Sequence, residues 1–183
     1  MANVVGLINL HSDVSLKGLT ERRPVASVSF LGRYGVIDFV LSNFSNSRID
    51  KVGILVKEKP RSLLKHIGSG NAWNFNSKRG GISLLYDEKY ANSNMYNHDI
   101  NNMLENIAFL EKSTEDYVVI SPAHIITTMD FSDVVEAHEK SGCDVTVVYK
   151  KIQNANEAFI GSDFLKIKDK QVVDFELNKG NRK

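Results

Sequence analysis

Short apolar runs rich in valine and isoleucine recur along the chain, with polar or helix-like segments between them. Continuous apolar runs of this length are typical of strands buried on both faces, as in parallel sheets. The last run, "DVTVVYK", alternates instead, which predicts that one of its faces is more exposed. The predicted strands are Asn3–Leu10, Val25–Phe30, Ile49–Val56, Ile82–Tyr86, Tyr117–Ser121 and Asp144–Tyr149.

Apolar residues at helical spacing lie between the predicted strands. Positions three and four residues apart share one side of a helix, so apolar residues at this spacing indicate a helix with a buried face. Proline favours the start of a helix and glycine the position just past its end, which sets the limits of two helices. The predicted helices contain Tyr34, Ile37, Leu41 and Phe44; Ile100, Met103, Leu104, Ile107 and Leu110; Pro60–Ile67, before Gly68; and Phe131–Ser141, before Gly142.

The alternation of strands and helices predicts the fold class. It indicates an α/β protein with an open, mostly parallel sheet and helices on both faces. In such sheets, ligands bind outside the carboxyl ends of the strands. The turns after Leu10, Val56 and Ser121 are therefore the places where chemistry is expected.

Two segments depart from this alternation. The stretch "FLKIKDKQVVDFE" predicts a hairpin around Asp169 and Lys170, an antiparallel addition near the end of the chain. Residues Gly68–Gly81 are polar and rich in glycine, and we expect a loop that could act as a lid over a site. Trp73 in this loop either stacks on a ligand or anchors the loop.

Composition narrows the possible partners. The 183 residues contain 23 Lys and Arg against 22 Asp and Glu, and this net charge of +1 gives no sign of nucleic-acid or membrane binding. No apolar run approaches the roughly 20 residues that span a bilayer. Cys143 is the single cysteine, which excludes an internal disulfide and fits a reducing cytoplasm. We therefore expect a cytoplasmic protein made of one domain or part of one.

The stretch "RPVASVSFLGRYGVIDFVLSNFSNSRIDKVGILV" is long and specific. It resembles the glucose-1-phosphate adenylyltransferases, whose members have "PFGGKYRIIDFPLSN" at this place. The resemblance continues in order through "IGSGNAWNFN", "RGGISLL", "ENIAFLE" and "YVVISPAHI". It implies a Rossmann-like nucleotidyltransferase sheet. It also implies that residues 1–183 are the N-terminal part of a nucleotidyltransferase-type domain, with the rest of that domain and a C-terminal β-helix domain absent from this chain.

The turn after the first strand differs from the family pattern "LAGGxGxRLxxLT". In the family, glycines let backbone N–H groups approach the triphosphate of the nucleotide. Here the three glycine positions hold Leu10, His11 and Asp13, and the arginine position holds Ser15. The resemblance therefore implies a phosphate turn that has lost the residues needed to bind phosphate.

Two further elements that handle phosphate charge are also changed. Arg23 matches the arginine of the family pattern "RxKPA", but the phosphate-directed lysine falls at Val25. The magnesium-binding aspartate of "SGDH" falls at Ala123, whose side chain has no oxygen to offer a metal. The resemblance thus implies no catalytic residues, no metal site and no strongly bound cofactor, and Mg²⁺ would be needed only by an active partner subunit.

Three residues remain as candidate contacts to a ligand or effector: Arg23, Arg33 and Trp73. Arg33 lies where family members keep lysine or arginine near an anionic effector. The second basic residue of that place is Gly35 here, which weakens such a site. A solvated surface arginine is an equally good interpretation of Arg33.

The pattern as a whole resembles the GlgD-type regulatory subunits of this family, which pair with a catalytic GlgC-type subunit in bacterial glycogen synthesis. It implies a silent or nearly silent subunit of a hetero-oligomer that binds nucleotide or sugar phosphate weakly, if it binds them. Two alternatives stay open. One is an active adenylyltransferase with a divergent phosphate site, and the other is a stand-alone sugar-phosphate or nucleotide sensor.

Overall fold

The computed structural model describes residues 3–10, 16–56, 59–75, 80–86 and 99–180. The chain forms two compact units, residues 1–144 and residues 145–183, and each is described by itself. Unit 1 contains the sheet and the candidate site. Unit 2 contains the C-terminal hairpin.

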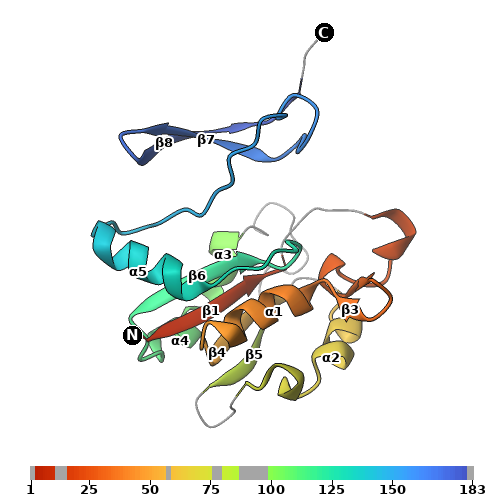
Figure 1. Ribbon diagram of the computed structural model, residues 1–183. Coiled ribbons are helices and arrows are strands. Elements are labelled where there is room, and N and C mark those ends of the chain that lie inside the picture. The colour runs from red at the N-terminus through yellow and green to blue at the C-terminus, as the bar shows by residue number, and fades with distance from the viewer. Residues whose placement is uncertain (1–2, 11–15, 57–58, 76–79, 87–98, 181–183) are drawn as a thin grey trace. The chain divides into compact units, whose positions relative to one another are not determined.

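Unit 1 is built on a four-stranded parallel sheet, shown in Figure 1. Its strands are β1 (Val4–Asn9), β4 (Lys51–Val56), β5 (Gly81–Tyr86) and β6 (Tyr117–Pro122), in the order β5-β4-β1-β6. Strand β1 lies in the middle and pairs with β4 on one side and with β6 on the other. Four of the predicted strands and the parallel sheet are confirmed.

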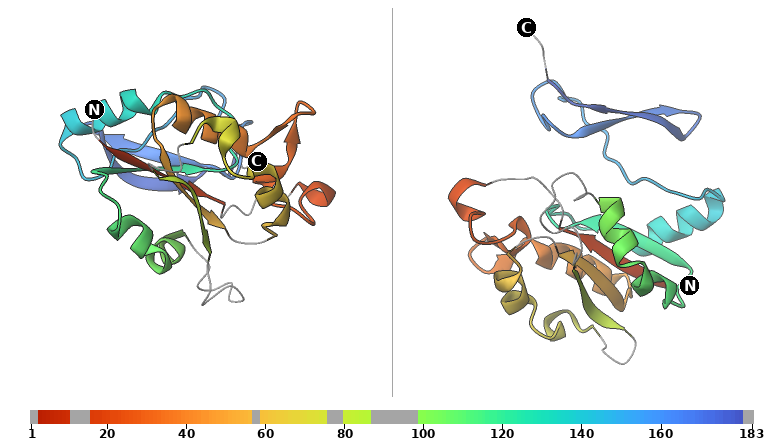
Figure 2. Two further views of the ribbon diagram at one scale, coloured as in Figure 1. Left: turned by 90° about the horizontal axis from the view of Figure 1, so that it is seen from below. Right: turned by 180° about the vertical axis from the view of Figure 1, so that it is seen from behind.

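Helices cover both faces of this sheet, as predicted (Figures 1 and 2). Two glycines on neighbouring strands show why the helices pack closely. A Cβ on Gly6 would lie 2.9 Å from a ring carbon of Phe44 in α1 (Ile37–Asn46). A Cβ on Gly53 would lie 2.7 Å from a ring carbon of Phe109 in α4 (Ile107–Glu111). Only glycine leaves room for these rings, one on each face.

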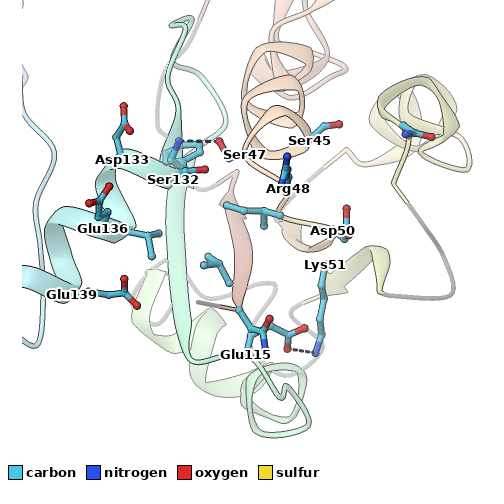
Figure 3. A pocket seen from close by; sticks show the side chains of 16 residues that line it. Ser45, Ser47, Arg48, Asp50, Lys51, Glu115, Ser132, Asp133, Glu136 and Glu139 are labelled. Atoms are coloured by element: carbon cyan, nitrogen blue, oxygen red, sulfur yellow. Dashed lines mark hydrogen bonds and ion pairs between the residues drawn. The ribbon is translucent and has the colours of Figure 1, made fainter. Parts of the chain in front are cut away.

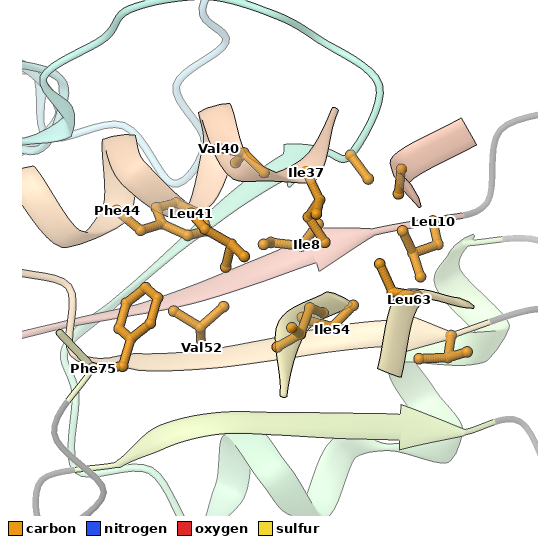
Figure 4. Packing of buried hydrophobic residues seen from close by; sticks show 14 of the residues in the cluster. Ile8, Leu10, Ile37, Val40, Leu41, Phe44, Val52, Ile54, Leu63 and Phe75 are labelled. Carbon is orange, nitrogen blue, oxygen red and sulfur yellow. The ribbon is translucent and has the colours of Figure 1, made fainter. Parts of the chain in front are cut away.

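The core lies between the sheet and α1, as Figure 4 shows. Ile37, Leu41 and Phe44 are fully buried on α1 and pack against apolar residues of β1 and β4. Burying an apolar side chain of this size contributes about 1.5–3 kcal/mol. The apolar residues whose helical spacing predicted α1 therefore form its buried face, which stabilises the fold. Tyr34, which the prediction included, lies outside the helix in β3 (Tyr34–Gly35).

The predicted strand Val25–Phe30 is wrong. Residues Val25–Ser27 form a 3-10 turn, η2, because the N–H and the hydroxyl of Ser27 both donate to the carbonyl of Pro24, at 3.0 and 3.1 Å. The chain then forms a small antiparallel hairpin, β2 (Ser29–Phe30) with β3 (Tyr34–Gly35), outside the main sheet. The apolar, valine-containing composition of this segment could not reveal the turn, because the hydrogen bonds that close the turn compete with strand pairing.

The predicted strand Asp144–Tyr149 is also absent. These residues have no regular structure, and Val145 and Tyr149 are 76% and 61% exposed. A strand needs a neighbour to pair with, and no described strand pairs with this segment. The alternation of apolar residues alone therefore did not predict a strand correctly.

The helix predicted around Ile100–Leu110 is divided in two, α3 (Asp99–Glu105) and α4. Asn106 lies at the division, with non-helical backbone angles. Its side-chain amide donates to the carbonyls of Tyr86 and Asn102, at 3.2 and 3.0 Å. Asparagine competes with the helix for backbone partners in this way, which accounts for the break.

The other predicted helices are confirmed as α2 (Arg61–Ile67) and α5 (Phe131–Ser141). Both end at a glycine with positive φ, Gly68 and Gly142, as the sequence predicted. Two short 3-10 turns complete unit 1: η1 (Lys17–Leu19) and η3 (Asn71–Trp73).

Unit 2 contains the predicted hairpin, formed by β7 (Asp163–Lys168) and β8 (Gln171–Leu177). Its turn residues Asp169 and Lys170 have φ of 51° and 65°, the conformation of a tight two-residue hairpin turn. The two strands form a sheet of their own rather than an addition to the parallel sheet. Asn178 follows, buried, with its amide donating to the carbonyls of Ala155, Ala158 and Phe159.

Candidate functional site

The candidate site lies where the carboxyl ends of β1 and β6 meet. Read across the sheet, the strands β5, β4, β1 and β6 are the third, second, first and fourth of its strands along the chain. The direction of the order therefore reverses between β1 and β6. In such sheets, this reversal opens the crevice where ligands bind. The N–H of Ala123 donates to the carbonyl of Asn9 at 2.9 Å, and the N–H of Leu10 donates to the carbonyl of Leu55 at 3.3 Å.

Apolar side chains fill the described part of this site. Leu10 is 8% exposed and Ala123 is 3% exposed, and both belong to the core cluster that also contains Ala26 and Leu63. Figure 4 shows Leu10 and Leu63 together at this end of the sheet. The two positions where the resemblance expects a phosphate-turn glycine and a magnesium carboxylate are therefore part of the hydrophobic core.

Two side chains, Asn43 in α1 and Ser47 just after its end, hold the loop that follows Ala123. Asn43 donates from its amide to the carbonyl of Thr127 at 2.9 Å, and its carbonyl oxygen accepts from the N–H of Met129 at 3.3 Å. The Ser47 hydroxyl accepts from the N–H of Phe131 at 2.8 Å and donates to the carbonyl of Asn43 at 2.7 Å. Asn43 lies in the stretch that carries the family resemblance, but its role in holding this loop was not predicted.

Asp130 caps the N-terminus of α5. Its carboxylate accepts from the N–H of Ser132 at 2.9 Å. This backbone hydrogen bond is the main cause that holds the pKa of Asp130 below its ordinary value. The acid nearest to Ala123 along the chain after β6 therefore has a structural role in starting a helix.

The lowered pKa of Asp130 predicts a pH dependence of stability. A depressed folded-state pKa contributes stability that is present above the unfolded pKa, about 4, and is lost as the pH falls through the folded value. Asparagine also caps helices but does not titrate, so we expect Asp130→Asn to flatten the loss of stability in acid. Urea unfolding midpoints at pH 7 and at about pH 3 measure this effect. An unchanged acid dependence in the variant would contradict it.

Of the remaining predicted positions of the phosphate site, the structure describes Arg23 and Val25. His11, Asp13 and Ser15 lie outside the described residues. Val25 begins η2, half-buried, and its carbonyl accepts from the N–H of Val28 at 2.9 Å. Arg23 is exposed just before Pro24.

A contact between His66 and Asp38, which sequence reasoning missed, lies between the segments that contain Arg33 and Trp73. The Nε2 atom of His66 lies 2.6 Å from Oδ1 of Asp38, and Oδ2 of Asp38 accepts from the N–H of Gly35 at 3.0 Å. The His66 ring lies 6.2 Å from that of Trp73. A Cβ at residue 35 would lie 2.7 Å from Nε2 of His66, so this arrangement requires glycine there. Asp38 and His66 are 28 residues apart, and no spacing in the sequence indicated the pair.

The described part of the loop Gly68–Gly81 does not lie over the candidate site. The carbonyl of Trp73 accepts from the hydroxyl of Ser45, at the C-terminal end of α1. Phe75 is buried beside Val52, near the start of β4 (Figure 4). The loop thus follows the amino ends of the strands, and its described residues do not form a lid. The packing of Trp73 against the core favours the anchoring role.

A polar cavity of about 880 Å³ also lies at the amino ends of the strands (Figure 3). Lys51 donates to Glu115 at 3.1 Å inside it. Burial opposes ionisation of Glu115, but hydrogen bonds from Ser113 and Lys51 outweigh this and hold its pKa below the ordinary value. Because ligands of such sheets bind at the opposite end, we do not assign the cavity as a nucleotide site. Its charged lining residues are Arg48, Asp50, Lys51, Glu115, Asp133, Glu136 and Glu139.

The described residues contain no cluster of metal ligands at the candidate site. Among them, no three His, Cys, Asp or Glu side chains gather as metal ligands, and Ala123 has replaced the expected carboxylate. Within the same residues, no helix is both long and apolar enough to cross a membrane.

The sheet order and the place of the site define the class: an α/β protein with a Rossmann-like parallel sheet. Residues 15–175 match the nucleotidyl transferase family, and the chain belongs to this family. It is 32% identical to the glycogen biosynthesis protein GlgD of Bacillus subtilis over 83% of this chain and 44% of that protein. It is 38% identical to the glucose-1-phosphate adenylyltransferase of Clostridium acetobutylicum over 76% of this chain and 37% of that protein.

A solved structure agrees with this fold. A Bacillus anthracis protein assigned as a glucose-1-phosphate thymidylyltransferase superposes with a TM-score of 0.73 at 15% identity, over 96% of this chain and 64% of that one. At this identity, the likeness shows the fold alone. The chain spans less than half the length of the two relatives described above.

Proposed function

We propose that this chain belongs to a regulatory subunit, silent or nearly silent in catalysis, of a bacterial glucose-1-phosphate adenylyltransferase in glycogen synthesis. The observation that supports this most directly is the burial of Leu10 and Ala123 in the core at the carboxyl end of the sheet. The likeness to the glycogen biosynthesis protein GlgD as well as to glucose-1-phosphate adenylyltransferases supports a role in glycogen synthesis, and the partner we propose is a GlgC-type catalytic subunit.

The reaction of this family needs charge on the enzyme to neutralise phosphate. Joining glucose 1-phosphate to the α-phosphorus of ATP relies mostly on positioning and on cations, including Mg²⁺. Val25 and Ala123 replace the phosphate-directed lysine and the magnesium carboxylate that the resemblance implies. Each charge-assisted contact is worth roughly 1.5–3 kcal/mol, and about 1.4 kcal/mol corresponds to a factor of ten. The two losses together reduce turnover by about two orders of magnitude or more.

A kinetic comparison tests the proposal. The native full-length protein is incubated with ATP, glucose 1-phosphate and Mg²⁺, alone and together with the catalytic subunit, and pyrophosphate release is measured. We expect turnover far below about 1 per second for the protein alone, and altered kinetics of the catalytic subunit in the mixture. The catalytic subunit alone is the control.

Two results would overturn the proposal. Turnover of about 1 per second or faster by the protein alone would favour an active enzyme with a divergent phosphate site. Unchanged kinetics of the catalytic subunit, with no co-purification, would favour a stand-alone sensor of sugar phosphate or nucleotide.

A further inference from the structure

The tip of the β2–β3 hairpin presents an apolar side chain at a strained backbone position. Leu31 is 78% exposed and has a φ of 51°, followed by Gly32 with a φ of 73°. Hairpin turns of this kind favour glycine, asparagine or aspartate, because other side chains crowd the backbone when φ is positive. A leucine here stabilises neither the turn nor the core, so its presence points to a role outside the folded unit.

Contacts with α1 hold the hairpin in place. The rings of Phe30 and Tyr34 lie 5.6 and 6.2 Å from that of Phe39 on α1, and the guanidinium of Arg33 lies 5.7 Å from the Tyr34 ring. Gly35 is bonded to Asp38, as described above. The base of the hairpin is thus fixed to α1, and Leu31 stays exposed at the tip instead of folding back.

The described residues at the end of unit 1 that contains the hairpin are rich in cations. Residues 16–35 and α2 lie at the same end of unit 1 in Figures 1 and 2, and Lys59 donates to the carbonyl of Thr20 at 3.4 Å. Within residues 16–35 and 59–67, Glu21 is the only exposed acid. Since the whole chain has a net charge of only +1, positive charge is concentrated here. The exposed cations are Lys17, Arg22, Arg23, Arg33, Lys59, Arg61 and Lys65.

We propose that this hairpin surface, Phe30, Leu31, Arg33 and Tyr34 with the surrounding cations, docks on the catalytic subunit. The complementary surface would be an apolar pocket that accepts Leu31, rimmed by carboxylates that face the cations. Buried apolar and aromatic anchors with arginine at the edge are the composition of binding hot spots, and opposite charges steer association. The identity of the partner rests on the proposed function.

Two other occupants fit the surface less well. A small phosphate-bearing anion would pair with the cations but would make no favourable contact with an exposed leucine. A second copy could offer the acidic residues of its α5, but the hairpin and α5 are different surfaces. Such a contact is head-to-tail, and it produces an open chain of subunits unless the rotation closes a ring.

The test uses Leu31→Asn in the native full-length protein, with binding to the catalytic subunit measured by calorimetry. Asparagine suits a positive φ, so the variant should fold at least as stably as the wild type. We expect affinity to fall about tenfold or more. Arg33→Glu should weaken binding as well, and the weakening should shrink at high salt.

Phe159→Asn is the matched control, because Phe159 is also apolar, 59% exposed and at a φ of 57°, but lies in unit 2. Retained affinity in Leu31→Asn, or an equal loss in Phe159→Asn, would overturn the hairpin assignment and leave the proposed function standing. Absence of binding by the wild type would overturn both. Self-association that depends on Leu31, without binding to the catalytic subunit, would identify a second copy and overturn the choice of partner. Binding of ATP or inorganic phosphate that depends on Arg33 but not on Leu31, without binding to the catalytic subunit, would identify a small anion as the ligand. That result would also overturn the choice of partner.

Discussion

Replacing Ala123 with aspartate is expected to destabilise the protein by about 3–5 kcal/mol and to produce no adenylyltransferase activity. The substitution restores the acid that the family resemblance implies at this position. However, Ala123 is 3% exposed and packs in the apolar cluster with Leu10 and Ala26. The introduced carboxyl would be buried among apolar groups that cannot solvate or pair it. Against a typical total stability of about 5–15 kcal/mol, this is a large loss.

Ala123→Asn is the matched control for this substitution. It adds nearly the same volume and an unpaired polar group, so the difference between the two variants isolates the charge. Burial raises the pKa of the introduced carboxyl above its unfolded value, so its penalty is largest at neutral pH. The penalty shrinks as the pH falls through the raised value toward about 4. Unfolding in urea at several pH values measures this. Substantial turnover by Ala123→Asp with ATP, glucose 1-phosphate and Mg²⁺ would contradict the proposed function.

The fold was largely predictable because the central strands of the sheet, β1 and β4, are buried on both faces. Continuous apolar runs located β1, β4, β5 and β6, and proline and glycine located the limits of α2 and α5. The errors arose where side chains compete with regular structure or where a strand has no neighbour. Ser27 closes a turn, Asn106 divides a helix, and residues 145–149 remain unpaired. Such outcomes depend on contacts between distant segments, which apolar periodicity does not encode.

The candidate site was predictable in place but not in its supporting contacts. The predicted carboxyl ends of strands and the motif comparison directed attention to the positions of Leu10 and Ala123, and the structure places both at the reversal of strand order. The burial of these residues could not be predicted, because it depends on Ala26 and Leu63 arriving from other elements. The bonds of Asn43 to residues 127 and 129 were equally hidden, since they join positions more than 80 residues apart.

Those bonds make Asn43→Leu the second substitution with a large expected effect. Asn43 is 6% exposed and satisfies both the carbonyl of Thr127 and the N–H of Met129. Leucine has a similar size but can make neither bond, so two polar backbone groups lose their partners. Thr127 is exposed and Met129 is half-buried, so water can reach this loop, and each lost hydrogen bond costs about 0.5–1.5 kcal/mol. We expect a total loss of about 1–3 kcal/mol of unfolding free energy. The loss should concentrate in residues 124–131, which connect β6 to α5.

Hydrogen exchange at individual amides distinguishes this local effect from general destabilisation. The amide of Met129 should lose protection first, while amides of the central strand β1 should change only with global stability. Asn46→Leu, an exposed position on the same helix, is the control and should stay within about 0.5 kcal/mol of the wild type. Equal losses of protection throughout the sheet would show that Asn43 serves the core rather than this loop. In that case the part of the family motif that contains Asn43 would specify packing instead of the path of the chain beside the candidate site.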